Sequence, residues 1–369
     1  MYSESLSRLS GSQVHVKCEN LQKTGSFKVR GAFNKLLRLG APGVVAASMG
    51  NHAQGVACAA SVLGIRARIF MPEGVSIVKE NAVRAYGAEV VVRGGTLAEA
   101  LEAAVAEGGD PFVHPYDDDD IIAGQGTLGL EIMEQVEDVD IVLVPVGGGG
   151  LISGIALAVK SLRPATRVIG VQTEAAKSAF LSFRGKTIVG EPPGPTLADG
   201  IAVGRVGERP FEIMRKFVDD VVTVTESSIA RAILLLLERK KLVVEGAGAV
   251  PLALLMEDSV KWRGRRAALV LSGGNIDFTL IDKIIYRGLV ESGRIGVLQA
   301  TINDVPGALN SITAVIAALR GNVITVSHDR LAPGLPVGKT KVRFTVEVKN
   351  IDHLSDIVRG LRTAGIQVE

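Results

Sequence analysis

Short β-branched runs alternate with alanine-rich helical stretches along most of this 369-residue chain. The runs indicate strands at 44–47, 67–71, 89–93 and 112–114, separated by helices at 51–63, 77–86 and 97–107. The pattern resumes with strands at 141–146, 167–171 and 267–271 and with helices at 151–162 and 226–240. Such alternation is typical of parallel sheets covered by helices. We expect an α/β fold with two parallel lobes that divide near residues 120–130.

From about Arg294 the order of elements changes. Strands at 295–302, 322–328, 341–348 and 366–368 and helices at 308–320 and 354–363 follow the order βαββαβ. This order predicts a separate ferredoxin-like module, which is either a regulatory domain or only an oligomerisation cap. We expect domains at 1–290 and 295–369, with a small lobe of roughly 35–125 inserted in the large lobe of the first domain.

Composition excludes several classes of partner. The net charge of +2 and the 4% aromatic content provide neither a basic stripe nor stacking platforms, so we expect no nucleic acid partner. Cys18 and Cys58 lie among small or apolar residues, which favours buried thiols in a reducing cytoplasm. The polar start, Met1 to Ser5, and the lack of a long apolar run predict a cytoplasmic protein without a membrane anchor.

Lys28 is the first candidate for chemistry. It lies in Ser-Phe-Lys-Val-Arg-Gly-Ala (26–32), between an aromatic residue and a Gly-Ala step. A catalytic lysine must be neutral, so its site must lower its pKa by burial or by a nearby cation. Phe27 is the expected source of apolar surroundings and Arg30 of charge. Taken alone, the segment is also compatible with an ordinary solvated lysine.

Three loops at predicted strand ends form candidate binding sites, because ligands bind at the carboxyl ends of parallel strands. Gly147 to Gly150 follow the strand at 141–146 and open a helix, as a phosphate cradle does. The Ser48 to His52 loop offers a hydroxyl, amides and an Asn side chain to a carboxylate. The third loop, Ser272 to Asn275, offers a hydroxyl that suits a ring nitrogen. Neither a P-loop lysine nor a dinucleotide fingerprint accompanies the glycines.

In this order, the motifs resemble the fold-type II pyridoxal-phosphate enzymes, which share the fold of tryptophan synthase β, and most closely the threonine dehydratases. The resemblance covers about residues 6–289. It implies that Lys28 forms the Schiff base with pyridoxal 5'-phosphate and that Phe27 and Glu245 lie near the ring. It also implies contacts of Asn51 with the ring hydroxyl and of Ser272 with the ring nitrogen. The implied phosphate site comprises Gly147, Gly148, Gly149, Gly150 and Leu151, and the implied substrate site comprises Ser48, Met49, Gly50, Asn51 and His52.

The implied reaction is β-elimination of L-threonine, and of L-serine, to 2-oxobutanoate or pyruvate and ammonia, with Lys28 as the base. The resemblance further implies a role in isoleucine biosynthesis and a homodimer or homotetramer. Serine racemase has a Ser where this chain has Met49, and an acid pair where it has Gln172 and Ser178, so we expect neither racemisation nor a metal ion. The family helix ahead of Leu6 is expected to be missing. A racemase, another hydroxy-amino-acid dehydratase and a non-catalytic amino-acid-binding regulator remain alternatives.

The C-terminal module resembles an ACT domain. The loop of Asp304, Pro306, Gly307 and Leu309 matches the position at which such domains bind amino acids, so isoleucine or another branched amino acid is an expected allosteric effector. A dimerisation sheet without an effector is the alternative. The acidic run 117–120 is expected to be solvated. The four histidines outside the candidate loops are expected to be structural, because they lack metal-ligand spacing: His15, His114, His328 and His353.

Overall fold

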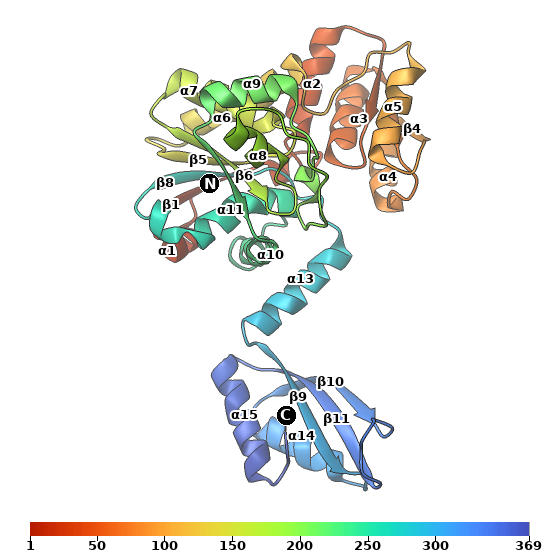
Figure 1. Cartoon of the computed structure of the whole chain (residues 1–369), viewed down its shortest axis with the longest axis vertical. Coiled ribbons are helices and arrows are strands. Elements are labelled where there is room, and N and C mark those ends of the chain that lie inside the picture. Colours follow the sequence, from red (N-terminus) through yellow and green to blue (C-terminus); the bar gives the residue numbers. More distant parts are fainter. Residues whose placement is uncertain (369) are drawn as a thin grey trace. The chain divides into compact units, whose positions relative to one another are not determined.

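The computed structural model describes residues 1–368 and divides into two compact units, Met1–Asp277 and Phe278–Glu369 (Figure 1). The first unit contains two wholly parallel sheets. The larger sheet has the order β1-β8-β5-β6-β7 and the smaller has the order β2-β3-β4. The α/β pattern expected from the sequence is therefore confirmed.

Strands and helices alternate along most of the first unit. The strands are β1 Gln13–Cys18, β2 Gly43–Ala47, β3 Arg66–Met71, β4 Glu89–Val92, β5 Ile141–Pro145, β6 Arg167–Thr173, β7 Asp220–Val224 and β8 Arg266–Leu271. The α-helices are α1 Glu4–Ser10, α2 Lys28–Leu39, α3 Asn51–Leu63, α4 Ile77–Arg84, α5 Leu97–Glu107, α6 Asp119–Gln135, α7 Gly150–Leu162, α8 Ser178–Gly185, α9 Glu208–Phe217, α10 Glu226–Leu235, α11 Gly246–Glu257 and α12 Ser259–Trp262. Two 3-10 helices, η1 Glu19–Leu21 and η2 Asp199–Ile201, and a π-helix, η3 Leu236–Lys240, complete the unit.

The prediction of a strand at 112–114 is wrong. Phe112 makes a single parallel bridge to Val45, and the chain then leaves the sheet. Val45 N–H donates to Pro111 O, and Val113 N–H donates to Val45 O. Proline cannot donate to a ladder, and Pro115 stands where the next hydrogen bonds would be needed. The chain therefore turns inward at Pro115 rather than extending the small sheet.

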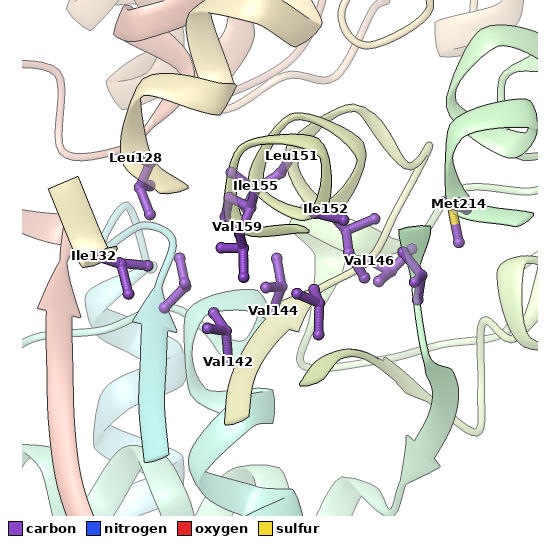
Figure 2. Packing of buried hydrophobic residues seen from close by; sticks show 14 of the residues in the cluster. Leu128, Ile132, Val142, Val144, Val146, Leu151, Ile152, Ile155, Val159 and Met214 are labelled. Atoms are coloured by element: carbon purple, nitrogen blue, oxygen red, sulfur yellow. The ribbon is translucent and has the colours of Figure 1, made fainter. Parts of the chain in front are cut away.

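Apolar packing fixes the elements that carry the loops at the strand ends. Figure 2 shows Ile155 and Val159 of α7 pointing toward Val142 and Val144 of β5, and all four side chains are buried. The period of the helix and the alternation of the strand each place apolar residues on the shared face. Because α7 is anchored on β5 in this way, its N-terminus lies directly after the end of that strand.

Helices α2 and α6 approach each other through glycines. A Cβ added to Gly124 of α6 would lie 2.6 Å from the Cα of Gly31 of α2. A Cβ added to Gly31 would lie 2.3 Å from the side-chain nitrogen of Gln125. Only glycine permits this contact between helix backbones. The start of α2, where Lys28 lies, is thereby fixed against α6.

The second unit begins with α13 Phe278–Glu291 and continues with β9 Ile295–Asn303, α14 Ala308–Ala318, β10 Asn322–Asp329, β11 Lys339–Glu347 and α15 Ile351–Thr363. The sheet is antiparallel with the order β10-β11-β9. Ile316, Phe344 and Ile357 lie in its buried core. The expected last strand is reduced to one bridge between Ala300 and Val368. Within residues 1–368, no helix is both long enough and apolar enough to span a membrane.

Candidate active site

One cavity of the first unit is lined by residues from the ends of strands in both sheets. All of the cofactor and substrate residues expected from the sequence line it. They are Phe27, Lys28, Ser48, Met49, Gly50, Asn51, His52, Gly147, Gly148, Gly149, Gly150, Leu151, Glu245 and Ser272. The segments that carry them are far apart in the sequence, and the carboxyl ends of parallel strands bring them together.

Backbone hydrogen bonds place Lys28 in this cavity. The N–H of Phe27 donates to Ser272 O at 3.0 Å, and the N–H of Gly274 donates to Gly25 O at 2.9 Å. The segment before Lys28 therefore pairs with the loop that follows β8, and α2 begins at Lys28 itself. Lys28 therefore lies at the carboxyl end of the large sheet, and two hydrogen bonds fix the backbone of the residues that precede it.

Part of the Lys28 side chain is exposed, but its ε-amine is surrounded by protein and donates to Pro115 O at 2.8 Å. Burial lowers the pKa of Lys28 to about 8, because a charged ammonium loses its hydration, and the carboxyl group of Glu245 partly opposes this shift. The Lys28 nitrogen lies 5.3 Å from the centroid of the Phe27 ring, which supplies the expected apolar wall. A substantial fraction of this amine is therefore neutral near physiological pH.

The expectation that Arg30 lowers the lysine pKa is wrong. The guanidinium of Arg30 binds both carboxylate oxygens of Glu19, at 2.8 and 2.9 Å, and both oxygens of Glu131, at 2.6 and 2.8 Å. Its side chain is only 13% exposed and that of Glu19 only 2%. Two carboxylates neutralise this cation, so its role is to tie α2 to η1 and α6.

The glycine run provides a helix N-terminus without side chains. The first intrahelical bond of α7 runs from Ser153 N–H to Gly149 O, so the helix leaves the preceding N–H groups without partners of its own. Gly149 is the only one of the four glycines in the left-handed region, with φ +94°. For Gly148 the constraint is space, because an added Cβ would lie 2.4 Å from the Tyr116 ring. The site is a cradle that suits a phosphate.

The Ser48 to His52 loop places the N-terminus of α3 at the cavity. The Ser48 hydroxyl accepts a hydrogen bond from Gly50 N–H at 3.2 Å, which tightens the turn before the helix. His52 is buried, and its Nε2 lies 2.9 Å from Val113 O. Burial and the nearby Lys28 lower the pKa of His52 to about 3, so the imidazole is neutral and its Nε2–H donates to that carbonyl.

Asn51 and Glu245 face each other in the cavity wall. The side-chain nitrogen of Asn51 donates to the two carboxylate oxygens of Glu245 at 2.9 and 3.1 Å. Burial raises the pKa of Glu245 to about 7. The hydrogen bond from Asn51 lowers it, as do Lys79 and Lys28, whereas Asp199 raises it further. Glu245 therefore binds or releases a proton close to neutral pH.

Several residues that the sequence did not single out also line the cavity, including Lys79, Pro115, Tyr116, Asp199 and Asn275. Lys79 of α4 and Asp199 of η2 form an ion pair at 3.5 Å, which joins the two lobes beside the cavity. Pro115 and Tyr116 directly follow the bridge at Phe112, so the strand-end rule that identified the other loops also applies to them. Asn275 belongs to a loop whose Ser alone was assigned a role.

The acidic run 117–120 is largely structural rather than solvated. Asp117 accepts hydrogen bonds from the N–H groups of Glu208 and Arg209 at the start of α9. Asp118 caps α6 by accepting from two N–H groups of its first turn. Only Asp119 is strongly exposed, at 81% of its side chain. Carboxylates at helix N-termini satisfy free N–H groups, which is why the run lies between two helices.

The second unit has a cavity of its own in the loop before α14. The four residues expected to bind an effector line it: Asp304, Pro306, Gly307 and Leu309. Arg330 and His328 line it as well, although neither was assigned this role from the sequence. The carboxylate of Asp304 pairs with the guanidinium of Arg330 at 2.7 Å. Gly307 precedes α14 with φ +87°, so another helix N-terminus faces this cavity.

One cavity combines an amine of lowered pKa with a glycine-lined helix N-terminus, and this combination suits a cofactor that carries a phosphate and a carbonyl group. Comparison with known proteins agrees. Residues 1–273 match the family of pyridoxal-phosphate dependent enzymes, and residues 295–365 match the ACT domain family. The chain belongs to the pyridoxal-phosphate dependent enzyme family and carries an ACT domain; its cofactor is pyridoxal phosphate.

Three relatives illustrate the similarity. L-threonine ammonia-lyase of Thermotoga maritima is 48% identical over an alignment that covers 100% of this chain and 93% of the relative. The processed form of threonine deaminase isoform 2 from Solanum lycopersicum has a TM-score of 0.74 and 38% identity, covering 77% of this chain and 85% of that one. Maize serine racemase has a TM-score of 0.73 and 34% identity, covering 79% of this chain and 92% of its own. The fold-type II architecture is thus shared by lyases and racemases.

Proposed function

We propose that the chain catalyses the pyridoxal-phosphate-dependent β-elimination of L-threonine, and of L-serine, to 2-oxobutanoate or pyruvate and ammonia. The observation that carries this proposal is the buried amine of Lys28, whose pKa is lowered to about 8 in a cavity that also holds two helix N-termini. The name of the Thermotoga maritima relative, which aligns with the whole chain, supports threonine as the substrate.

Lys28 is the proposed base. Its neutral Nζ removes the proton from the α-carbon of the amino acid, and burial keeps part of the amine neutral for this step. The bond between the β-carbon and its hydroxyl group then breaks, and the hydroxyl group leaves with the bonding electrons and a proton as water. Pyridoxal phosphate, when bound, supplies the conjugated ring that makes this proton acidic. Ser272 provides a hydroxyl rather than a carboxylate at the end of β8, which suits a ring nitrogen without a full positive charge.

Each of the two helix N-termini is proposed to bind one anionic group, either the cofactor phosphate or the substrate carboxylate. The N–H groups at the start of α7, with Gly147 to Gly150 and Leu151, are proposed to hold the cofactor phosphate. The N–H groups at the start of α3, with the Ser48 hydroxyl, are proposed to hold the substrate carboxylate. This division orients the substrate so that its α-carbon lies near Lys28, because both loops line the same cavity.

Met49 favours elimination over racemisation, because it stands where racemisation would need a second acid or base. Racemisation needs a second acid or base on the face of the substrate opposite to the lysine. Met49 lies next to Ser48 in the substrate loop and lines the cavity, but its thioether cannot carry a proton. The proposal is therefore a single-base elimination, and the serine racemase reaction is the alternative outcome of the test.

The test is a steady-state comparison of L-threonine, L-serine and their D-forms with the full chain and added pyridoxal phosphate. Formation of 2-oxobutanoate from L-threonine, measured by a coupled dehydrogenase assay, is the expected result. Chiral chromatography of the remaining amino acid should reveal no D-form. Accumulation of D-serine without 2-oxo acid would replace the proposal with racemisation.

We also propose that residues 1–290 carry catalysis and that residues 295–369 bind a branched amino acid that regulates it, as part of a homodimer or homotetramer. The second cavity supports the effector site, because it combines the N-terminus of α14 with the cation Arg330 and the anion Asp304. Calorimetric titration with isoleucine, valine and leucine, together with light scattering for the mass, tests these points. Absence of heat and of any change in activity would contradict the effector.

A further inference from the structure

A chain of three side chains runs along one wall of the cavity. The side-chain nitrogen of Asn275 donates to Thr24 O at 2.9 Å and to the side-chain oxygen of Asn51 at 2.6 Å. The side-chain nitrogen of Asn51 then donates to both oxygens of Glu245, at 2.9 and 3.1 Å. Asn275, Asn51 and Glu245 all line the cavity. Each contact is short enough for a sound hydrogen bond.

The direction of this chain is set by the backbone. The oxygen and nitrogen of an amide side chain are assigned from their hydrogen-bond partners, and a backbone carbonyl can only accept. Thr24 O therefore requires the nitrogen of Asn275 on its side. That nitrogen in turn requires the oxygen of Asn51, so the nitrogen of Asn51 must face Glu245. A single fixed carbonyl thus determines the orientation of two amides.

The local backbone reserves space for this arrangement. Gly25 has φ +70°, and an added Cβ would lie 2.4 Å from the side-chain oxygen of Asn275. The N–H of Gly274 donates to Gly25 O at 2.9 Å, so the loop that carries Asn275 is bound to the segment that carries Thr24. The position of Asn275 is therefore fixed by the same pairing that places Lys28.

We infer that Asn275 is a positioning residue, which holds the amide of Asn51 with its nitrogen toward Glu245 and the cavity so that Asn51 offers the cofactor ring a donor and never an acceptor. The amide nitrogen of Asn51 has two hydrogens. One hydrogen shared between the two Glu245 oxygens accounts for both distances, which leaves the second for the cavity. This inference rests on the proposed contact between Asn51 and the ring hydroxyl of pyridoxal phosphate.

The test compares Asn275→Asp with the wild-type holoenzyme. Aspartate has the same shape, but its ionised carboxylate cannot donate to Thr24 O or to Asn51. Its carboxylate then competes with that of Glu245 for the nitrogen of Asn51, and when this nitrogen turns toward residue 275 the oxygen of Asn51 faces Glu245 and the cavity. We expect the affinity for pyridoxal phosphate to fall about tenfold or more, because a buried acceptor would face the ring oxygen. We also expect the visible absorption band of the bound cofactor, and the pH at which it changes, to shift.

Two further variants at this position keep the result decisive. Asn275→Ser retains a hydroxyl donor and should recover part of the affinity and the wild-type band. If Asn275→Asp does not fold, Asn275→Ala removes the donor without adding charge and is measured in the same way. Unchanged affinity and an unchanged band in the folded Asp or Ala variant would overturn the inference. Weaker binding with an unchanged band would reduce Asn275 to a structural role and would overturn it as well.

Asn20 provides the matched control. It is a buried asparagine whose side-chain nitrogen donates to Val243 O at 3.0 Å, but it lies outside the cavity lining. Asn20→Asp should lower the thermal unfolding temperature without moving the absorption band. Cofactor binding is read independently of turnover. A wild-type chain that binds pyridoxal phosphate but makes no 2-oxo acid would therefore contradict the proposed function, while the Asn275 comparison would still be tested.

Discussion

The ε-amine of Lys28 donates a hydrogen bond to the carbonyl oxygen of Pro115 at 2.8 Å, across 87 positions of sequence. The carbonyl belongs to the loop that leaves the small sheet after a single bridge at Phe112. A carbonyl cannot neutralise an ammonium, so burial still dominates and the pKa of Lys28 stays low. This contact fixes the ε-amine of Lys28 at the wall of the cavity.

Replacement of Lys28 by Ala should abolish turnover while the chain still folds. Loss of the base alone costs about a hundredfold to ten-thousandfold in rate, and loss of covalent attachment adds to this. The measurement is 2-oxobutanoate formation, together with mass spectrometry after borohydride reduction. Lys216→Ala removes an exposed lysine of α9 and should leave both unchanged. Borohydride labelling of the Lys28→Ala protein at another lysine would contradict the assignment.

Attachment of pyridoxal phosphate to the cofactor-free chain should depend on pH through Lys28. The neutral fraction of an amine with a pKa of about 8 rises about tenfold per pH unit below pH 8 and levels off above it. Stopped-flow absorbance from pH 6 to pH 10 measures this rate. The same lowered pKa means that the unfolded chain binds more protons between about pH 8 and pH 10.5, so the unfavourable contribution of this lysine to folding stability decreases as the pH rises through this range. A rate that keeps rising to pH 10 would contradict a buried lysine.

Glu245 should make the cofactor-free chain less stable as the pH rises from about 4.5 to about 7. Its folded-state pKa is raised above the unfolded value, so the folded chain binds more protons in this window. A rise from 4.5 to about 7 corresponds to a loss of at most about 3 kcal/mol, which is complete above pH 7. Glu245→Gln keeps an acceptor for Asn51 and should flatten this part of the curve. Urea unfolding at pH 5 and pH 7.5 is the measurement, and identical curves for both proteins would refute the prediction.

Gly148→Ala should disturb both stability and cofactor binding. The added Cβ would lie 2.4 Å from the Tyr116 ring, so the ring or the cradle must move, at a cost of about 1 to 3 kcal/mol. Thermal unfolding and the dissociation constant for pyridoxal phosphate measure the two effects. Gly95→Ala meets nothing within 4 Å and serves as the control. Adding Tyr116→Ala to Gly148→Ala should restore stability if the overlap with the ring is the cause.

Arg30→Met should destabilise the chain without changing the lysine pKa. The substitution leaves the carboxylate of Glu19, only 2% exposed, without its partner, which costs about 3 to 5 kcal/mol. Arg38→Met, at a side chain that is 68% exposed and paired with Asp120, should cost less than about 1 kcal/mol. Urea unfolding compares the two variants. The pH midpoint of cofactor attachment should remain near 8 in Arg30→Met, and a shift would show that Arg30 acts on Lys28 through its charge.

Local patterns predicted the elements of the first unit well where capping and periodicity agree. The helices expected at 51–63 and 97–107 coincide with α3 and α5, which are bounded by Gly50 and Gly64 and by the cap of Thr96. The helices expected from the sequence do not include α6, which begins within the acidic run 117–120. The signal was present: an Asp at the N-cap followed by acids in the first turn favours a helix start.

The loops of the candidate site that directly follow strands could be predicted from the sequence. The rule that ligands bind at the carboxyl ends of parallel strands selects the loops of Ser48, Gly147 and Ser272, and all three line one cavity. Which distant groups meet Lys28 could not be predicted. The contact with Pro115 and the pairing of Arg30 with Glu19 and Glu131 depend on how α2 packs on α6 and on the bridge at Phe112, and these are tertiary contacts without a local pattern.

The contact between Gly148 and the ring of Tyr116 has a consequence for motion. Tyr116 follows the small sheet and Gly148 follows the large one, so the cradle of α7 is also a joint between the two lobes. A ligand that orders this cradle would restrain both lobes at once. Backbone hydrogen exchange near this contact would then report on occupancy of the phosphate site, and removal of the cofactor should raise the exchange rate in both lobes.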